Sequence, residues 1–296
     1  MAYLQITILT SRDAAEHISD ALEEIEALAV TLEDAQDHPL FQLQPQEMPL
    51  WETVNIKALF PETASVENII TQLTPHLNIE TPIHYDSELI EDQDWVRLTQ
   101  QHFKPQCYAG HLWICPSWHT EPLEGHVVSI DPGLAFGTGT HPTTSLCLDW
   151  LAHNPPQHKV VIDYGCGSGI LALAAQRLGA TRVYAVDHDE QALLATTNNA
   201  QLNADITSDQ LIVCYPEELP PIKADVIIAN ILSGPLISLE PTLENLLKPN
   251  GIIILSGLLE HEVPFILEVY QQHFNIIDIT IQEQWARITA SINQGE

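Results

Sequence analysis

The hydrophobic pattern of the first ninety residues predicts a small domain of mixed helices and strands. Apolar side chains at every second position indicate strands, and apolar side chains three and four residues apart indicate helices. The expected order is strand, helix, strand, strand, helix, strand, over residues 3–9, 14–28, 28–32, 53–60, 64–73 and 78–84. This order is typical of a ferredoxin-like α+β domain. We assign that domain to residues 1–92 and expect a short helical linker over residues 93–106.

From residue 107 to residue 296, short apolar runs alternate with helical patterns. The expected strands lie at 160–162, 182–186, 210–214, 225–229 and 252–256, with helices between them, and two last strands lie at 276–282 and 285–292. Strands that alternate with helices favour a doubly wound parallel sheet. The sequence therefore predicts a second, α/β domain with a Rossmann-like sheet whose final strand pair is antiparallel.

A glycine-rich turn followed by a helix joins the strands expected at 160–162 and 182–186. The glycines and acids of this segment are Asp163, Gly165, Gly167, Gly169 and Asp187. Glycine lets the backbone turn sharply and approach a ligand closely because it has no Cβ atom. Asp187 follows the second strand, where its carboxylate can accept hydrogen bonds from both hydroxyl groups of a ribose. The unit therefore predicts a site for an adenosine-type cofactor.

Two cofactors compete for such a unit, and Asp163 distinguishes them. The dinucleotide fingerprint is G-x-G-x-x-G, which sets a pyrophosphate against the start of a helix. Here the spacing is G-x-G-x-G, with Asp163 two residues before the first glycine. A carboxylate at that position suits an ammonium group and suits a pyrophosphate poorly. We therefore expect S-adenosylmethionine, which carries an amine and a sulfonium, in preference to a nicotinamide dinucleotide.

The segment DPGLAFGTGTHPTT, residues 131–144, is a second candidate for the cofactor site. Pro142 is suited to the first turn of a helix, and a long loop rich in glycine and threonine precedes it. Hydroxyl and amide groups at a helix start can hold a carboxylate, such as that of S-adenosylmethionine. The alternative is an ordinary helix entry. From this segment we select Phe136, Gly137 and Thr144 as candidate cofactor-binding residues.

The charge of the chain bears on its partners. Forty acids against ten lysines and arginines give a formal net charge of -30. Nucleic-acid binders need clustered basic side chains to contact phosphates, so a direct DNA or RNA substrate is not expected. Long-range attraction instead favours a basic protein as partner. The alternative is that the acidity serves solubility alone.

The remaining composition predicts a cytoplasmic protein without a bound metal. No apolar run approaches the ~20 residues of a membrane span, no secretory signal is evident, and five cysteines suggest free thiols. Potential zinc ligands recur every fourth residue at Cys107, His111, Cys115 and His119. The segment is predicted to be extended, which separates successive members by ~13 Å. One tetrahedral site cannot collect ligands at that spacing.

Several segments carry a resemblance to a known family. They are IDPGLAFGTGTHPTTSLCL, VIDYGCGSGILALAA, VDHD and ADVIIANIL, with LWICPSW before the loop and WARITA at residues 285–290. At these segments, over about the last two thirds of the chain, the sequence resembles the bacterial ribosomal protein L11 methyltransferases. The resemblance implies trimethylation of lysine side chains and of the N-terminal α-amine of L11, with S-adenosylmethionine as methyl donor.

The resemblance also assigns roles to residues. Thr144, Gly165, Asp187 and Asn230 fall on the positions that hold S-adenosylmethionine in the family. In that family the N-terminal domain recognises the target protein and moves relative to the catalytic domain. We expect the protein to be a monomer. Two other functions stay open: a class I methyltransferase for another protein or a small amine, and a non-catalytic module that binds an adenosine ligand.

Asn230 follows the strand expected at 225–229, and we expect it to orient the substrate amine. Methyl transfer needs an uncharged amine whose lone pair faces the methyl group. Many amine methyltransferases carry N-P-P-Y at this point, whereas this chain has N-I-L-S, so the proline and aromatic support is absent. The alternative for Asn230 is a plain polar cap at the end of a strand.

Overall fold

The chain forms two compact units, Met1–Leu98 and Thr99–Glu296. The structure is a computed structural model that describes residues 2–36, 51–76, 84–90, 103–131, 141–203, 205–207 and 209–293. The boundary between the units lies within the range expected for the linker. Residues 93–102 of that range lie outside the described residues, and Phe103 to Pro105 are not helical.

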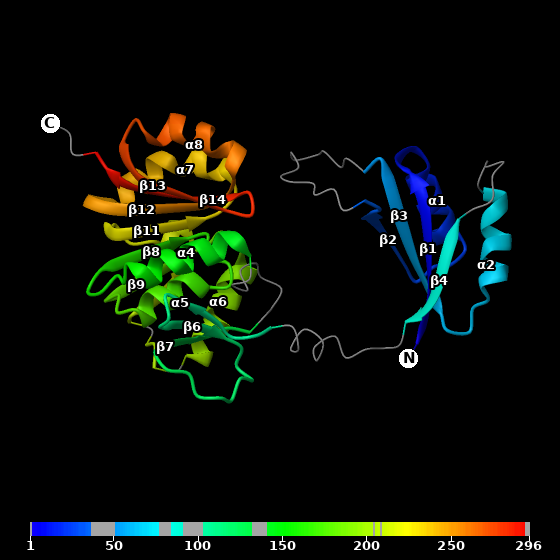
Figure 1. The fold of residues 1–296 in the computed structure, drawn as a ribbon, viewed down its shortest axis with the longest axis horizontal. Coiled ribbons are helices and arrows are strands. Elements are labelled where there is room, and N and C mark those ends of the chain that lie inside the picture. Colours follow the sequence, from blue (N-terminus) through cyan, green and yellow to red (C-terminus); the bar gives the residue numbers. More distant parts are fainter. Residues whose placement is uncertain are drawn as a thin grey trace. The chain divides into compact units, whose positions relative to one another are not determined.

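The first unit is a four-stranded antiparallel sheet with two helices (Figure 1). Its elements are β1 (Tyr3–Ser11), α1 (Arg12–Glu24), β2 (Ala29–Asp34), β3 (Thr53–Pro61), α2 (Val66–Leu73), the 3-10 turn η1 (Thr74–His76) and β4 (Tyr85–Ile90). The strand order in the sheet is β2-β3-β1-β4, and each neighbouring pair is antiparallel.

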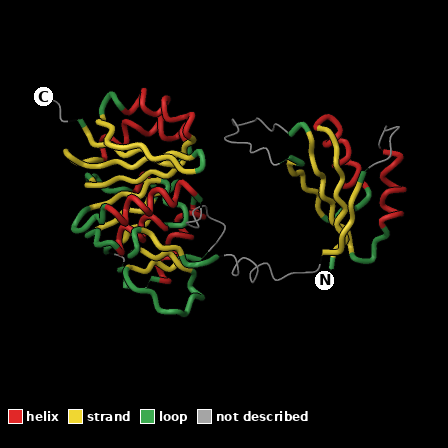
Figure 2. The backbone as a smooth tube through the Cα atoms, viewed as in Figure 1, coloured by secondary structure: helices red, strands yellow, loops and turns green. Residues whose placement is uncertain are grey.

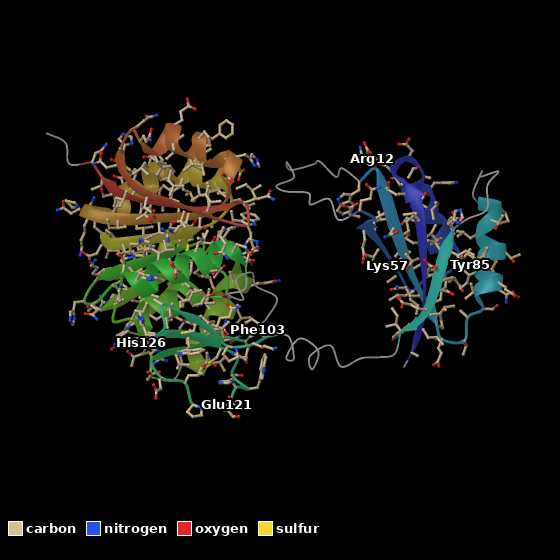
Figure 3. The ribbon with its side chains drawn as sticks, in the orientation of Figure 1. Arg12, Lys57, Tyr85, Phe103, Glu121 and His126 are labelled. Atoms are coloured by element: carbon tan, nitrogen blue, oxygen red, sulfur yellow. The ribbon has the colours of Figure 1, made fainter. Side chains whose placement is uncertain are left out.

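The two-residue repeat of β1 and β3 produces the core of this unit. Ile6 of β1 and Ile56 of β3 are fully buried and pack with Ile18 of α1. The alternate positions of the sheet are polar: Lys57 of β3, labelled in Figure 3, forms an ion pair with Glu33 of β2 at 2.7 Å. A single amphipathic sheet therefore buries one face against the helices, as its alternating sequence predicts.

The structure describes a fourth strand that directly follows the range expected for it. The sequence analysis placed it over 78–84, and the structure has it at Tyr85–Ile90, where Tyr85 is labelled in Figure 3. Residues 77–83 lie outside the described residues. The strand lies at the edge of the sheet and nearly all of its side chains are exposed. An edge strand with little buried surface carries no clear hydrophobic alternation, so the pattern could not locate it.

The second unit contains a seven-stranded sheet and a small three-stranded sheet (Figures 1 and 2). The small sheet is β5 (Gln106–Tyr108), β6 (Leu112–Cys115) and β7 (His126–Ser129). The large sheet has β8 (Val160–Tyr164), β9 (Arg182–Val186), β10 (Leu211–Cys214), β11 (Ala224–Asn230), β12 (Leu247–Leu259), β13 (Phe274–Gln282) and β14 (Trp285–Ile292). The helices are α4 (Pro142–His153), α5 (Ile170–Arg177), α6 (Glu190–Leu202), α7 (Ser233–Leu246) and α8 (Val263–Tyr270), with 3-10 turns η2 (Pro216–Glu218) and η3 (Glu260–Glu262).

The large sheet has the order β10-β9-β8-β11-β12-β14-β13. Its first five strands are parallel, and β14 is antiparallel to both β12 and β13. The predicted doubly wound sheet with an antiparallel final pair is therefore confirmed. Pro235 lies in the first turn of helix α7, where a proline is tolerated.

Helices cover both faces of this sheet, which explains the continuous apolar runs of its strands. Val161 packs in a core with α4 and α5, whereas its neighbour Ile162 packs in a second core with α7 and α8. Both side chains are fully buried. The segment that contains Cys107 and Cys115 was expected to be extended throughout, but it is a hairpin: β5 and β6 pair antiparallel, with a turn at Ala109 and Gly110 between them. All five cysteines are free thiols.

None of the helices within the described ranges is long and apolar enough to cross a membrane.

A small ionic cluster lies where the chain leaves α8. The Nδ1 atom of His273 lies 2.9 Å from Oε1 of Glu240 and 3.7 Å from Oε2 of Glu244, both on α7. The Glu240 side chain is buried. Its hydrogen bond raises the pKa of His273 above the usual value, and the charges of both glutamates add to this effect.

This raised pKa predicts a pH-dependent contribution of His273 to stability. The folded protein binds the proton more tightly than the unfolded chain, so the stabilisation is fully present below the unfolded pKa of ~6.5 and is lost as pH rises through the folded pKa. We expect the melting temperature of His273→Gln to fall below that of the wild type at a pH of about 5.5, and the difference to shrink by a pH of about 9. His153→Gln controls for removal of an exposed histidine. A His273→Gln difference that does not change with pH would contradict the coupling.

Candidate cofactor and active site

The strand order of the large sheet reverses between β8 and β11. Val161 pairs with Val226 and Asp163 pairs with Ile228, so the carboxyl ends of these two strands are adjacent. Open α/β sheets bind their ligands at such a reversal, beyond the carboxyl ends of the strands. The glycine turn that follows β8 and the Asn230 that ends β11 therefore lie at the position where a ligand is expected.

The glycine turn is attached to the end of β9. The carbonyl oxygen of Val186 accepts hydrogen bonds from the backbone amides of Gly165, at 2.7 Å, and of Cys166, at 3.1 Å. Gly165, Gly167 and Gly169 have φ angles of 81°, 54° and 79°, a region that residues with a Cβ atom rarely adopt. The motif is therefore glycine-rich because its backbone conformation requires glycine.

Asp187 lies directly beyond β9 and closes the turn. Its Oδ2 accepts a hydrogen bond from the Gly167 amide at 3.0 Å, and its Oδ1 accepts one from the Asp189 amide at 3.1 Å. Each carboxylate oxygen has two lone pairs, so one remains on each oxygen for a further donor. This arrangement fits the predicted contact with two ribose hydroxyl groups.

Asp163 has a structural task that the sequence did not reveal. It is fully buried, and its Oδ2 accepts a hydrogen bond from the Ala172 amide in the first turn of α5, at 2.9 Å. Burial raises the pKa of Asp163 to about 7, against the effect of that hydrogen bond, and the charge of Asp187 adds to the rise. Its Oδ1 has no hydrogen-bond partner within the described residues. That unpartnered acceptor fits the ammonium group of the expected cofactor.

Thr144 and Asn230 meet, although 86 residues separate them in sequence. The Asn230 Nδ2 donates a hydrogen bond to the Thr144 Oγ1 at 3.2 Å. Thr144 is fully buried in the first turn of α4. The Oδ1 of Asn230 is buried and, like that of Asp163, finds no partner in the described parts of the chain. The two candidate residues therefore belong to one site.

The start of α4 is fixed by its own cap and by the sheet. His141 is the N-cap residue, and its Nδ1 accepts a hydrogen bond from the Thr143 amide. Burial lowers the pKa of His141, which favours the neutral ring that this cap needs. The Ser256 hydroxyl group of β12 lies 3.3 Å from the Thr143 carbonyl oxygen and 3.1 Å from that of Ala286, and it can donate its one hydrogen to either. Pro142 occupies the first helical turn, as predicted.

Phe136 and Gly137 lie outside the described residues, as do all of residues 132–140. Both ends of the segment are described. At its start, the Asp131 carboxylate accepts hydrogen bonds from the amide and the hydroxyl group of Ser117, at 2.8 and 2.7 Å. At its end, His141 begins α4.

Sequence reasoning missed the polar side of α6. Thr196 donates a hydrogen bond to the Gly167 carbonyl oxygen at 3.0 Å, and Asn199 donates one to the Ser168 carbonyl oxygen at 2.9 Å. The Asn199 Oδ1 also accepts from the Asp131 amide at 3.3 Å. These α6 residues connect the glycine turn to the start of the 131–144 segment. The sequence did contain a signal for this contact. Thr196, Asn199 and Asn203 are spaced so that their three polar side chains lie on one face of a helix.

This arrangement can be compared with known proteins. The family model of ribosomal protein L11 methyltransferase (PrmA) matches residues 2–293. The chain belongs to this family. The match confirms the resemblance that the motifs of the second unit indicated and extends it over the first unit.

Individual family members match over nearly their full length. The ribosomal protein L11 methyltransferase of Histophilus somni (strain 2336) is 45% identical over 295 residues, which are 99% of each chain. That of Pseudomonas putida strain KT2440 is 43% identical over 290 residues, covering 98% of this chain and 99% of the relative.

One solved structure supports the fold. A ribosomal protein L11 methylase from Lactobacillus delbrueckii subsp. bulgaricus is 31% identical, with a TM-score of 0.59 over 65% of this chain and 100% of that chain. The expected class I methyltransferase fold of the second unit is therefore confirmed.

We predict that Gly165→Ala destabilises the second unit more than Gly110→Ala does. Both glycines have positive φ angles, 81° and 73°. A Cβ atom on Gly165 would lie 2.2 Å from the Cγ2 of Ile231, whereas one on Gly110 would meet no atom within 4 Å. At Gly110 the positive φ angle alone should lower the free energy of unfolding by about 1–2 kcal/mol. At Gly165 the clash with Ile231 should lower it by about 1–3 kcal/mol more. Hydrogen exchange of the β8 and β9 amides measures the loss of stability in each variant. Equal losses in Gly165→Ala and Gly110→Ala would contradict the prediction.

We predict a similar contrast between two asparagines of α6. Asn199→Ala leaves the Ser168 carbonyl and the Asp131 amide without their partner, which costs about 1–3 kcal/mol of stability. Asn198 is the adjacent, exposed asparagine, and its replacement by alanine should change stability by no more than about 0.5 kcal/mol. Urea denaturation measures both values. Calorimetry should also show weaker binding of S-adenosylmethionine to Asn199→Ala alone, and unchanged binding would limit Asn199 to a structural role.

Proposed function

We propose that this protein methylates ribosomal protein L11, transferring methyl groups from S-adenosylmethionine to lysine side chains and to the N-terminal α-amine, up to three on each nitrogen. One observation carries the proposal. This chain belongs to the L11 methyltransferase family, and three features lie together where the strand order of its sheet reverses. They are the glycine turn, the acid Asp187 that suits a ribose, and the buried acceptor oxygen of Asn230. Binding alone would need the first two features, whereas the asparagine acceptor suits an amine substrate.

We assign the cofactor to residues around the glycine turn. Gly165 and Gly167 allow close approach, Asp187 accepts the ribose hydroxyl groups, and Asp163 receives the ammonium group through its unpartnered Oδ1. S-adenosylmethionine, when bound, supplies a methyl group on a positively charged sulfur. Phe136, Gly137 and Thr144, from the 131–144 segment, complete the proposed set.

We assign the orientation of the amine to Asn230. An amine that donates one N–H to the Asn230 Oδ1 keeps its lone pair free and points it in a defined direction. Positioning of this kind accounts for up to ~7–11 kcal/mol of barrier reduction in well-oriented systems. A buried acceptor without a partner costs about 1–3 kcal/mol, and the arriving amine removes that cost.

The substrate amine must lose a proton before it reacts. A lysine has an unperturbed pKa of ~10.4, and transfer into a dry, apolar site beside a positive charge lowers it. His141 lies in the neighbouring helix start, but its Nδ1 is engaged in the cap of α4. In this proposal, water accepts the proton.

We assign recognition of L11 to the N-terminal domain, residues 1–92, and catalysis to residues 107–296. The strand and helix order of the first unit, with the sheet order β2-β3-β1-β4, supports a ferredoxin-like domain. The net charge of -30 favours a basic protein over nucleic acid as the direct substrate. The proposal takes the enzyme to be a cytoplasmic monomer.

Intact-mass spectrometry of L11 after incubation with the enzyme and S-adenosylmethionine tests the proposal. We expect mass gains in steps of ~14 Da that end at multiples of three methyl groups. Asn230→Ala should lower kcat about a hundredfold because the amine loses its orienting acceptor. Asn198→Ala, which removes an exposed side chain on α6, should react like the wild type.

The possible results separate the alternatives. No mass gain on L11, with calorimetric binding of S-adenosylmethionine intact, rejects L11 as substrate and favours another protein or a small amine. Binding without methylation of any amine tested, poly-lysine included, favours the non-catalytic module. Full activity of Asn230→Ala would reject the role of Asn230 alone.

A further inference from the structure

Residues 230–233, which we call the asparagine segment, join β11 to α7 and carry Asn230. Their sequence is N-I-L-S, so they lack the prolines of the N-P-P-Y motif. A proline restricts the backbone by itself because its ring fixes φ. In this chain, contacts with neighbouring segments must hold the backbone that carries Asn230.

The middle of the asparagine segment is held by the sheet. The backbone amide of Ile231 donates a hydrogen bond to the Ser256 carbonyl oxygen of β12 at 3.2 Å. A Cβ atom on Gly257 would lie 2.4 Å from the Ile231 carbonyl oxygen, and one on Gly165 would lie 2.2 Å from the Ile231 Cγ2. Ile231 therefore packs closely between β12 and the glycine turn.

The end of the asparagine segment is held by Glu262, which follows β12. The Ser233 hydroxyl group donates a hydrogen bond to the Glu262 Oε1 at 2.6 Å, and the Leu259 amide donates one to the Glu262 Oε2 at 2.7 Å. Ser233 is buried at the start of α7, and Leu259 is the last residue of β12. Hydrogen bonds to a carboxylate are roughly twice as strong as those between neutral groups. One side chain therefore connects the start of α7 to the end of β12.

These attachments bear on the rate of methyl transfer because they lie within three residues of Asn230. Asn230 itself pairs with Ser256 at the end of β11, so its backbone is fixed on the strand side. The bond from Ser233 to Glu262 fixes the backbone on the helix side. A misplacement of about 1 Å at a reacting group can cost about a hundredfold in rate. The position of the Asn230 oxygen relative to the amine therefore depends on both sides.

We propose that Glu262 is a positioning residue: its carboxylate holds the asparagine segment to the end of β12 and so sets where Asn230 meets the substrate amine. This inference rests on the proposed function. Loss of the carboxylate lowers the rate of methyl transfer and leaves cofactor affinity intact, because Val186 and Asp187 hold the glycine turn separately.

Four variants of the full chain test the proposal. Glu262→Ala removes both hydrogen bonds. Glu262→Gln can keep both, because its oxygen can accept from the Leu259 amide while its nitrogen donates to the Ser233 hydroxyl group. Ser233→Ala removes only the bond to the asparagine segment. The double variant, Glu262→Ala with Ser233→Ala, shows whether the two residues act through one contact.

Two matched controls remove the same side chains at exposed positions nearby. Glu260→Ala removes an exposed glutamate of the same 3-10 turn η3. Ser238→Ala removes an exposed serine of α7 whose hydroxyl group donates to the Gly234 carbonyl oxygen. For every variant we would measure kcat and KM on L11, the Kd of S-adenosylmethionine by calorimetry, and the melting temperature, with rates taken well below the lowest melting temperature.

We expect Glu262→Ala and Ser233→Ala each to lower kcat about tenfold, less than a full misplacement costs, because β12 still holds Ile231. The Kd of S-adenosylmethionine and the KM for L11 should stay within about twofold of the wild type. Glu262→Gln should recover most of the rate. The double variant should lose no more than Glu262→Ala does, and both controls should match the wild type.

Other results would overturn the proposal. An unchanged kcat for Glu262→Ala means that the carboxylate does not position the asparagine segment. A Kd for S-adenosylmethionine that rises as much as kcat falls indicates a general loosening of the site, and a rise in KM alone assigns Glu262 to binding of L11. Additive losses in the double variant mean that Glu262 and Ser233 act separately.

Two further outcomes keep the test decisive. Should Glu262→Ala fail to fold, Ser233→Ala, which keeps the bond from the Leu259 amide, carries the same comparison. An inactive wild type that binds S-adenosylmethionine rejects the proposed function, and this inference with it. An active wild type whose kcat none of the four variants changes rejects this inference alone.

Discussion

The attachment of the glycine turn to the end of β9 is the constraint on which the site depends. One carbonyl oxygen, that of Val186, accepts two backbone amides of the turn, and the Asp187 carboxylate accepts a third. These bonds hold the turn in a conformation with positive φ angles that only glycine adopts freely. Because β8 also pairs with β11, the same turn lies beside the end of β11. The sheet itself therefore brings Asp187 and Asn230 to one edge, and the site needs few further contacts.

Two buried acceptors at this edge have no partner in the described structure: Oδ1 of Asp163 and Oδ1 of Asn230. Each such atom costs about 1–3 kcal/mol, which a protein selected only for stability would avoid. Asp163 shows how part of the cost is offset, because its other oxygen holds the first turn of α5. The remaining cost falls where, in the proposed function, two ligands would remove it: the ammonium group of the cofactor at Asp163 and the amine of the substrate at Asn230. Buried polar atoms that reduce stability in this way are typical of functional sites.

The sequence was most informative where one residue type has one physical use. The glycine spacing, the two-sided apolar runs of β8 and β11 and the proline of α4 predicted the turn, the sheet and the helix start. Side chains with several uses were harder to interpret. Asp163 was interpreted only as a partner for the cofactor, because nothing in the sequence shows that its carboxylate reaches the Ala172 amide nine residues later. Asn199 was missed for the same reason, since a buried and an exposed asparagine on α6 look alike in sequence. The edge strand β4 lacked the buried face that makes a strand recognisable.

The last strand of the sheet shows how a distant segment supports the site. Arg287 is buried in β14 and donates to the Leu146 carbonyl oxygen of α4, while Asp278 and Thr280 of β13 receive its other nitrogen. The Trp285 ring packs edge-on against the ring of His141, the cap of α4, with centroids 4.7 Å apart. The segment at 285–290 thus contributes to the site through α4, which carries Thr144. An arginine buried without partners is costly, so these hydrogen bonds offset the burial of Arg287 and link β13 and β14 to α4. The start of α4 is therefore set by the antiparallel end of the sheet, and the glycine turn by its parallel part. The two halves of the site meet at the hydrogen bond between Thr144 and Asn230, and they are also joined by Asn199, which bonds to the Ser168 carbonyl oxygen and to the Asp131 amide.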